Sequence, residues 1–251
     1  ATAVAVSAVG PSASAVTYQL EKGDVTVGQD GTGAYSYQNQ TNGKTDNVYV
    51  DQDTQNNGQI IITQAEGTKT DNTVTVEEDV TNDKGKRDVD IILDGVNVDT
   101  SDTSTQTDTP TEVSADTKED KTIIKVGEGA DVDLTVKDSN LTTGGNGIDI
   151  GVNLKDKDDN KETKVDLTLD NTEINLTEKA NTAGIVARDH STVNVTLKGE
   201  NTIDGKEALE DAAKEAEEAK KEGKSSPNRN VEGIRVGGEN AGDDSEGDGA
   251  S

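Results

Sequence analysis

The fold is decided by a six-residue stretch that occurs in four related copies, the clearest of which is Val165-Asp-Leu-Thr-Leu-Asp170. Apolar and polar residues alternate in it with a period of two, which is the pattern of a β-strand that buries one face. The other copies align with it without gaps and begin at Val89, Val132 and Val193. We therefore expect four equivalent strands that turn Val, Ile and Leu side chains toward a common core.

Two further strands are predicted to accompany each copy. A shorter strand is expected five residues after the last inward position, around Val98, Leu141, Ile174 and Thr202. Another strand precedes each copy, around Val74, Ile123, Ile148, Ile185 and Ile234. The shortest spacing in this series is 25 residues, from Ile123 to Ile148. Three strands in a repeat of about 25 residues predict an all-β chain folded as a parallel β-helix.

The longer spacings contain polar insertions, which solenoids accommodate in their turns. We expect such insertions at 101–120 and 153–163, and a helix over 206–222 in which Glu210 precedes Lys214 by four residues. The β-helix is predicted to span 59–238. Residues 16–58 contain less regular strand patterns and are predicted to form an N-terminal β cap that protects the end of the helix.

The two ends of the sequence differ from the repeats. Residues 1–15 are small and apolar and finish with Ala13-Ser-Ala15, which resembles a signal-peptide cleavage motif. We expect a signal-peptide remnant there, with a disordered tail as the alternative. Residues 239–251 are rich in Gly, Asp and Ser, and we expect either a disordered tail or a truncated end of the last coil.

Composition taken alone is typical of a disordered chain, because the formal net charge is −27 and only 29% of the residues are hydrophobic. The alternating strands reverse that expectation, since a solenoid needs only a narrow aliphatic core. The negative charge argues against binding to nucleic acid, whose phosphates it would repel. Cysteine is absent, so disulfides and thiolate metal sites are excluded. No stretch is long and apolar enough to span a membrane.

Several segments resemble a known group of proteins. VDLTLDNTEI from Val165, AGIVAR from Ala183, STVNVTLKGENTI from Ser191 and EGIRVGG from Glu232 look like extracellular repeat proteins of Gram-positive bacteria. Those proteins are right-handed parallel β-helices of the pectate-lyase-like superfamily, often described as carbohydrate-binding domain proteins. The resemblance covers about residues 59–238, and its motifs are degenerate. It implies a right-handed helix in a secreted or cell-wall protein.

The resemblance leaves two functions open. The first is a non-catalytic module for adhesion or glycan binding, expected to be monomeric, whose partner would be an extracellular polysaccharide or a host or cell-surface glycan. The alternative is a polysaccharide lyase or glycoside hydrolase on the same fold. Enzymes of the superfamily carry acidic, Arg or Lys residues at particular coils, and no pattern here allows any of them to be carried over. We therefore assign no catalytic residue and no required cofactor.

An acidic row is the main candidate for a metal site. Asp90, Asp133 and Asp166 occupy one equivalent outward position in three copies, and Asn194 occupies it in the fourth. Stacked strands would place them about 4.8 Å apart. Carboxylates at that spacing repel one another unless cations bridge them. We expect weak calcium binding along this row, beside a matching threonine row at Thr135, Thr168 and Thr196.

Three weaker motifs complete the candidates. Asp149 ends Gly144-Gly-Asn-Gly-Ile-Asp149, which matches most of a calcium-binding nonapeptide but occurs once rather than in tandem. Asp156-Lys-Asp-Asp-Asn160 resembles half of an EF-hand loop and lacks its closing Glu, so a charged turn is the simpler interpretation. His190 is the only histidine, and we expect it in a solvent-exposed turn rather than in an acid–base pair with Asp189.

Overall fold

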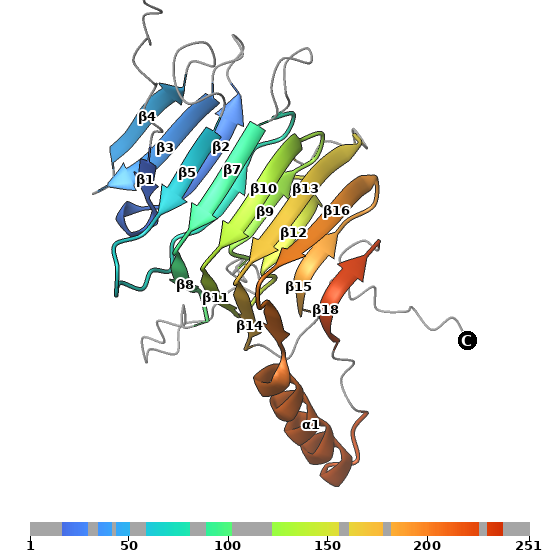
Figure 1. The fold of residues 1–251 in the computed structure, drawn as a ribbon. Helices are drawn as coiled ribbons and strands as arrows, with labels where there is room; N and C mark the ends of the chain where they lie inside the picture. The colour runs from blue at the N-terminus through green and yellow to red at the C-terminus, as the bar shows by residue number, and fades with distance from the viewer. Residues whose placement is uncertain are drawn as a thin grey trace, which may run out of the picture.

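The computed structural model describes residues 17–29, 35–41, 44–50, 59–80, 89–101, 122–155, 161–177, 182–225 and 230–237. Within these ranges the chain forms three mainly parallel β-sheets, a short 3-10 helix (Leu20–Lys22) and one α-helix (Figure 1). The prediction of an all-β chain with parallel strands is confirmed at this level. The predicted segments 1–15 and 239–251, nearly all of 101–120 and the middle of 153–163 lie outside the described residues.

Sheet A contains the four strands predicted from the aligned copies and two earlier ones. Its order is β1 (Thr17–Gln19), β5 (Gln59–Thr63), β7 (Val89–Asp94), β10 (Asp131–Lys137), β13 (Thr163–Asp170) and β16 (Ser191–Lys198). Every neighbouring pair is parallel. The register pairs Val132 with both Val89 and Val165, and Val165 with Val193. This is the register that the gap-free alignment predicts.

Sheets B and C hold the accompanying strands. Sheet B contains β2 (Val25–Gln29), β6 (Val74–Val76), β9 (Ile124–Gly127), β12 (Ile148–Val152), β15 (Thr182–Ala187) and β18 (Val231–Val236) in parallel order. At the β2 edge it is extended by two antiparallel strands, β3 (Tyr35–Thr41) and β4 (Lys44–Val50). Sheet C contains β8 (Asn97–Asp99), β11 (Asn140–Thr143), β14 (Glu173–Leu176) and β17 (Thr202–Asp204).

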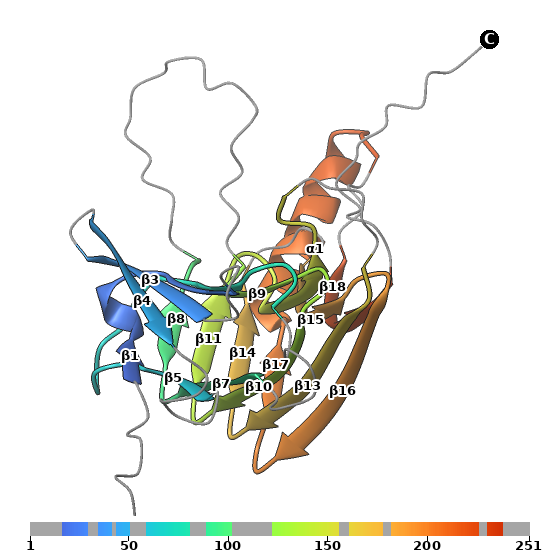
Figure 2. The same cartoon turned by 90° about the horizontal axis from the view of Figure 1, so that it is seen from above.

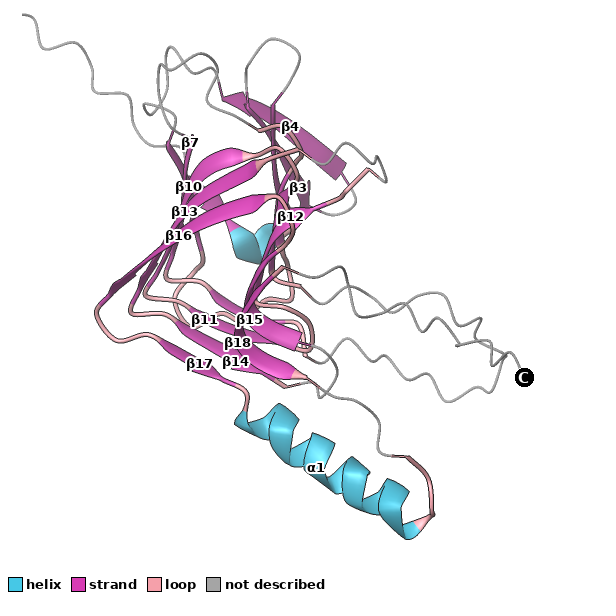
Figure 3. Ribbon diagram, turned by 90° about the vertical axis from the view of Figure 1, so that its right-hand side faces the viewer, coloured by secondary structure: helices cyan, strands magenta, loops and turns pink. Residues whose placement is uncertain are grey.

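The chain visits the three sheets in a fixed order. Starting at β6, β9, β12 and β15, it passes through one strand of sheet B, one of sheet A and one of sheet C, and we call each such passage a circuit. Strand β18 then returns to sheet B. Strands of one sheet lie side by side along the stack (Figure 2), and the sheets face a common interior (Figure 3). The circuits that start at β6, β9 and β12 therefore bury their apolar faces in this interior.

The interior is a column of aliphatic side chains. In β7 and β10 of sheet A the burial alternates, so that Val, Ile and Leu point inward and the other side, apart from Ile92, is polar. Burying each such side chain contributes about 1.5–3 kcal/mol relative to exposure, so the column makes up for the scarcity of aromatic residues. The largest fully buried side chains come from all three sheets and from the 3-10 helix: Leu20, Ile62, Ile91, Leu93, Ile123, Ile124, Leu134, Leu141, Ile148, Ile150 and Leu167.

The structure corrects two predicted positions. In sheet B, Ile124 rather than Ile123 pairs with Val74 and Ile148, so the shortest spacing is 24 residues. Both isoleucines are fully buried, and hydrophobicity could not distinguish them. In sheet C, Ile203 rather than Thr202 pairs with Ile174. The turn before β17 contains one more residue than its counterpart before β14, which shifts the register by one.

Two further segments are the predicted N-terminal cap and the predicted helix. Strands β1 and β2 fall within 16–58, the predicted cap, yet they pair in parallel with β5 and β6, whereas β3 and β4 are antiparallel. Helix α1 (Lys206–Lys221) lies within the predicted 206–222 and extends away from the sheets (Figures 1 and 3). It is anchored by Ala208, which is fully buried. No helix in the described part of the chain is long and apolar enough to cross a membrane.

Candidate functional site

The outer face of sheet A is a flat array in which equivalent residues of neighbouring strands form rows. Because side chains alternate along each strand, every second residue of β7, β10, β13 and β16 points outward. The first row contains Asp131, Lys164 and Thr192. The second, the Asp row, contains Asp90, Asp133, Asp166 and Asn194. The third, the Thr row, contains Ile92, Thr135, Thr168 and Thr196. The fourth, the alternating row, contains Asp94, Lys137, Asp170 and Lys198.

The structure brings together three of the four predicted metal residues. Asp133 pairs directly with Asp90 on one side and with Asp166 on the other. At the end of the row, the Nδ2 of Asn194 donates a hydrogen bond of 2.7 Å to the Oδ1 of Asp166. The other rows of this face either balance acidic with basic residues or are uncharged. The negative charge of the face is therefore concentrated in the Asp row.

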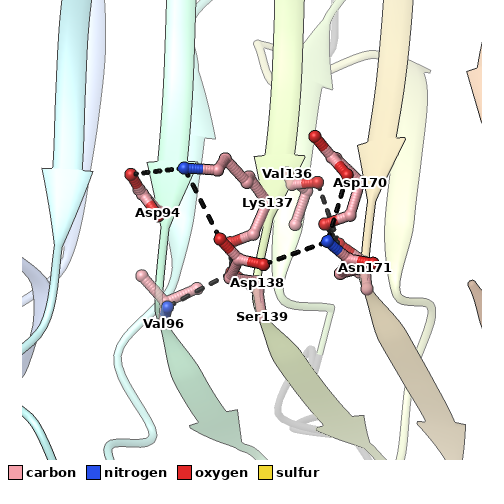
Figure 4. Close-up of polar contacts among 9 residues, drawn as sticks. Asp94, Val96, Val136, Lys137, Asp138, Ser139, Asp170 and Asn171 are labelled. Carbon is pink, nitrogen blue, oxygen red and sulfur yellow. Dashed lines mark hydrogen bonds and ion pairs between the residues drawn. The ribbon is translucent and has the colours of Figure 1, made fainter. Parts of the chain in front are cut away.

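The alternating row contains an ion pair between neighbouring strands. The Nζ of Lys137 lies 3.4 Å from the Oδ2 of Asp94 and 3.5 Å from the Oδ2 of Asp138 (Figure 4). Hydrogen bonding to Asp94 and the charge of that carboxylate, followed by the same effects from Asp138, raise the pKa of the Lys137 ammonium above its ordinary value. Sequence reasoning missed this row, although its signal is present in the aligned copies, which end in Asp, Lys, Asp and Lys.

A left-handed backbone turn joins sheet A to sheet C in every circuit. Gly95, Asp138, Asn171 and Gly199 follow the last residue of their strands and have φ angles of 68°, 48°, 51° and 65°. Glycine adopts this conformation without strain, and Asp and Asn tolerate it better than other residues. The Nδ2 of Asn171 donates to the Oδ1 of Asp138 at 3.3 Å (Figure 4). The Oδ1 of Asn171 accepts from the Glu200 backbone N–H at 3.2 Å. These bonds hold the stacked turns, and hence the strand ends, in register.

Asp149, the fourth predicted metal residue, lies elsewhere. It belongs to β12 in sheet B, and its side chain is only 4% exposed. Arg188 donates two hydrogen bonds of 2.8 Å to it, from Nε to Oδ1 and from Nη2 to Oδ2. The Nδ2 of Asn146 adds a third at 2.9 Å. Charge-assisted bidentate pairs are among the strongest polar contacts in proteins. Here the nonapeptide-like segment supplies a buried ion pair.

The remaining candidates are placed as follows. His190 is exposed, has a φ of 61° and lies in the turn from β15 to β16, which agrees with the predicted turn histidine. The EF-hand-like segment 156–160 lies outside the described residues. Within the described ranges, no group of three or more His, Cys, Asp or Glu side chains is arranged to hold a metal ion.

No family model matches the chain, and neither a curated protein nor a solved structure matches it.

Proposed function

We propose that the chain is a right-handed parallel β-helix that serves as a secreted or cell-wall binding module, and that it contacts a hydroxyl-rich polymer such as an extracellular polysaccharide. The observation that carries this proposal is the outer face of sheet A, where four strands present polar side chains in register. Hydroxyl and carboxylate groups repeated from strand to strand suit a ligand that itself repeats. The cyclic order of the three sheets supports the β-helix.

The Thr row and the Asp row would contact a sugar polymer through two kinds of group, hydroxyls and carboxylates. Thr135, Thr168 and Thr196 each offer a hydroxyl that donates and accepts hydrogen bonds. The Asp row beside them offers acceptors for the hydroxyls of a sugar. A flat face of this kind binds through many weak contacts rather than through one deep pocket. We propose that the module acts as a monomer and without catalysis.

Weak calcium binding along the Asp row is part of the proposal. Two unit charges about 5 Å apart in water repel by about 0.8 kcal/mol, so Asp133, with a carboxylate on each side, experiences about 1.6 kcal/mol at low ionic strength. A divalent cation between rungs would relieve this repulsion. Screening by salt would weaken the effect, since the Debye length falls to about 8 Å at physiological ionic strength.

Thermal unfolding with and without calcium tests the cation proposal. At low ionic strength we expect calcium to raise the Tm, and we expect Asp133→Asn to remove most of that rise. Asp131→Asn is the matched control, because it removes the same charge from the same strand at a position paired with Lys164. An unchanged Tm in calcium, or an equal loss of the calcium response in both variants, would contradict the proposal.

A glycan array combined with an assay for released reducing or unsaturated sugar tests the binding function. We expect retention of a polysaccharide class without release of product. The variant Thr135→Lys/Thr168→Lys should lose retention, because it places two long charged side chains on the flat face. Release of sugar by the unmodified protein would favour the lyase or hydrolase instead. Absence of binding to every glycan tested would contradict the binding module.

A further inference from the structure

The insertion in the third circuit, which starts at β12, contacts the first circuit, which starts at β6. It separates β12 from β13, and its described residues are 153–155 and 161–162, which we call the strap. The Oε1 of Glu78 accepts hydrogen bonds of 2.8 Å from the backbone N–H groups of Leu154 and Lys155. Glu78 lies in the turn that follows β6. The strap is therefore bonded to a circuit that is not its neighbour in the stack.

Two ion pairs accompany these hydrogen bonds. The Nζ of Lys155 lies 3.8 Å from the Oε2 of Glu78, and the Nζ of Lys161 lies 2.7 Å from the Oδ2 of Asp79. The side chain of Glu78 is 8% exposed, whereas that of Asp79 is 53% exposed. Exposed ion pairs contribute little to stability, whereas a carboxylate that accepts backbone hydrogen bonds away from water contributes more. Glu78 is therefore the firmer of the two attachments.

The second circuit, which starts at β9, has a glycine where the outer ion pair crosses it. A Cβ on Gly129 would lie 2.5 Å from the Oδ1 of Asp79 and 3.1 Å from the Cδ of Lys161. The φ of Gly129 is 74°, which also favours glycine. Its N–H donates a hydrogen bond of 3.0 Å to the Oγ1 of Thr163 at the start of β13. The turn of the second circuit is thus held between the first circuit and the third.

Backbone hydrogen bonds at the same turns join only neighbouring circuits. The Asp79 N–H donates to the Glu128 carbonyl, and the Glu128 N–H donates to the Val152 carbonyl, both at 3.0 Å. Where repeats contact only their neighbours, stability is a sum of repeat terms and nearest-neighbour terms, and opening can stop between any two repeats. The strap adds a contact between the first and third circuits. Opening of the first circuit must then break a contact with the third as well.

We propose that the strap is a coupling device that makes the first three circuits open as one cooperative unit, and that Glu78 is the residue on which the coupling depends. Proteins open locally in contiguous cooperative units, and contacts of this kind decide how far a unit extends. The three circuits carry Asp90, Asp133 and Asp166, so the strap holds these rungs of the Asp row together. The coupling is a property of the fold and does not depend on a ligand.

Native-state hydrogen exchange on the full chain tests the coupling. Val74→Ala removes a fully buried side chain from β6 and so destabilises the first circuit. With Glu78 present, we expect this substitution to lower the protection of β13 amides about as much as that of β7 amides, by at least about tenfold. In the Glu78→Ala background it should still lower protection in β7 but lower it in β13 by less than about threefold.

Two variants serve as comparisons. Glu173→Ala is the matched control, because it removes an exposed carboxylate from β14 of the third circuit, and it should leave transmission from β7 to β13 unchanged. Glu78→Gln keeps a side-chain oxygen as acceptor but loses the charge, so its transmission should lie between that of wild type and that of Glu78→Ala. It also answers the question if Glu78→Ala does not fold.

Salt separates the two attachments of the strap. In 1 M sodium chloride the Debye length is about 3 Å, so the exposed pair of Asp79 and Lys161 is largely screened. The hydrogen bonds to Glu78 are screened much less, because that side chain is only 8% exposed. We therefore expect transmission from β7 to β13 to persist in salt.

Three results would overturn the proposal. The first is equal transmission of the Val74→Ala effect to β13 with and without Glu78. The second is a loss of protection in Glu78→Ala that is confined to the amides of Leu154 and Lys155, because the contact would then be only local. The third is a loss of transmission in salt when Glu78 is present, because the exposed ion pair would then carry the coupling.

Discussion

The ion pair between Asp149 and Arg188 gives the sharpest stability prediction. The two side chains share two hydrogen bonds of 2.8 Å, and Asp149 has a third from Asn146. The exposed fractions differ, at 4% for the Asp149 side chain and 20% for that of Arg188. A charge left behind without its partner is costly in proportion to its burial. The two single substitutions should therefore differ in their effect.

The magnitudes follow from that asymmetry. Breaking a buried pair by removing one partner typically costs about 3–5 kcal/mol. Arg188→Met leaves a buried carboxylate with only an amide donor, and we expect it to lower the free energy of unfolding by about 3 kcal/mol. Asp149→Asn leaves a guanidinium that can reach water, and we expect a loss of about 2 kcal/mol. The double variant should lose no more than the worse single variant, which gives a coupling of about 2 kcal/mol.

Urea denaturation followed by circular dichroism measures all four proteins of this cycle. The expected order of stability is wild type first, Asp149→Asn second, and Arg188→Met together with the double variant last. A coupling below about 0.5 kcal/mol would refute the reasoning, because independent sites add within that margin. Equal losses in the two single variants would refute the argument from burial.

Two further predictions concern the turns and the pH dependence. Gly95→Ala should lower the free energy of unfolding by about 1–2 kcal/mol, since φ is 68° and the new Cβ meets no atom within 4 Å. Gly199→Ala should lose more hydrogen-exchange protection at its turn, because its Cβ would collide with the Oδ1 of Asn171. Equal losses of protection at the two turns would contradict this. Burial acts to raise the pKa of Asp99, but hydrogen bonds from Lys69 and Ser101 outweigh it and hold the pKa below its ordinary value of 3.8. The stabilisation from this carboxylate is thus fully present above the unfolded value and is lost as the pH falls through the folded one. The difference in unfolding free energy between wild type and Asp99→Asn should be constant above about pH 5 and shrink below about pH 4. A difference that grows on acidification would contradict the lowered pKa of Asp99.

Sheet A could be predicted from the sequence because its strands alternate strictly and align without gaps. A period of two fixes which side chains face the core, and a one-residue slip would reverse every one of them. The register of the Asp and Thr rows follows directly from that constraint. The alternating row follows from the same alignment, since the four aligned copies end in Asp94, Lys137, Asp170 and Lys198.

The errors arose where the period-two signal was absent or ambiguous. Ile123 and Ile124 are adjacent and both buried, so no alternation distinguished them. A constant loop length predicts Thr202 at the inward position of β17, but the turn at Gly199 contains an extra residue and Ile203 takes that position. The calcium prediction for Asp149 stays a prediction, whereas its ion pair with Arg188 could not be predicted, because the two residues lie 39 positions apart in the sequence. The two residues come together because β12, which contains Asp149, pairs with β15, which Arg188 directly follows.

Disulfide trapping tests the central claim most directly, namely that consecutive circuits stack in the register that forms the rows. The chain has no cysteine, so only introduced thiols can react. Thr135 and Thr168 are directly paired and point outward, at a spacing within the range that a disulfide spans. We predict that Thr135→Cys/Thr168→Cys cross-links on mild oxidation, whereas Thr135→Cys/Asp170→Cys, offset by about 7–8 Å, does not. Efficient cross-linking of the offset pair, or none of the aligned pair, would contradict the stacked register.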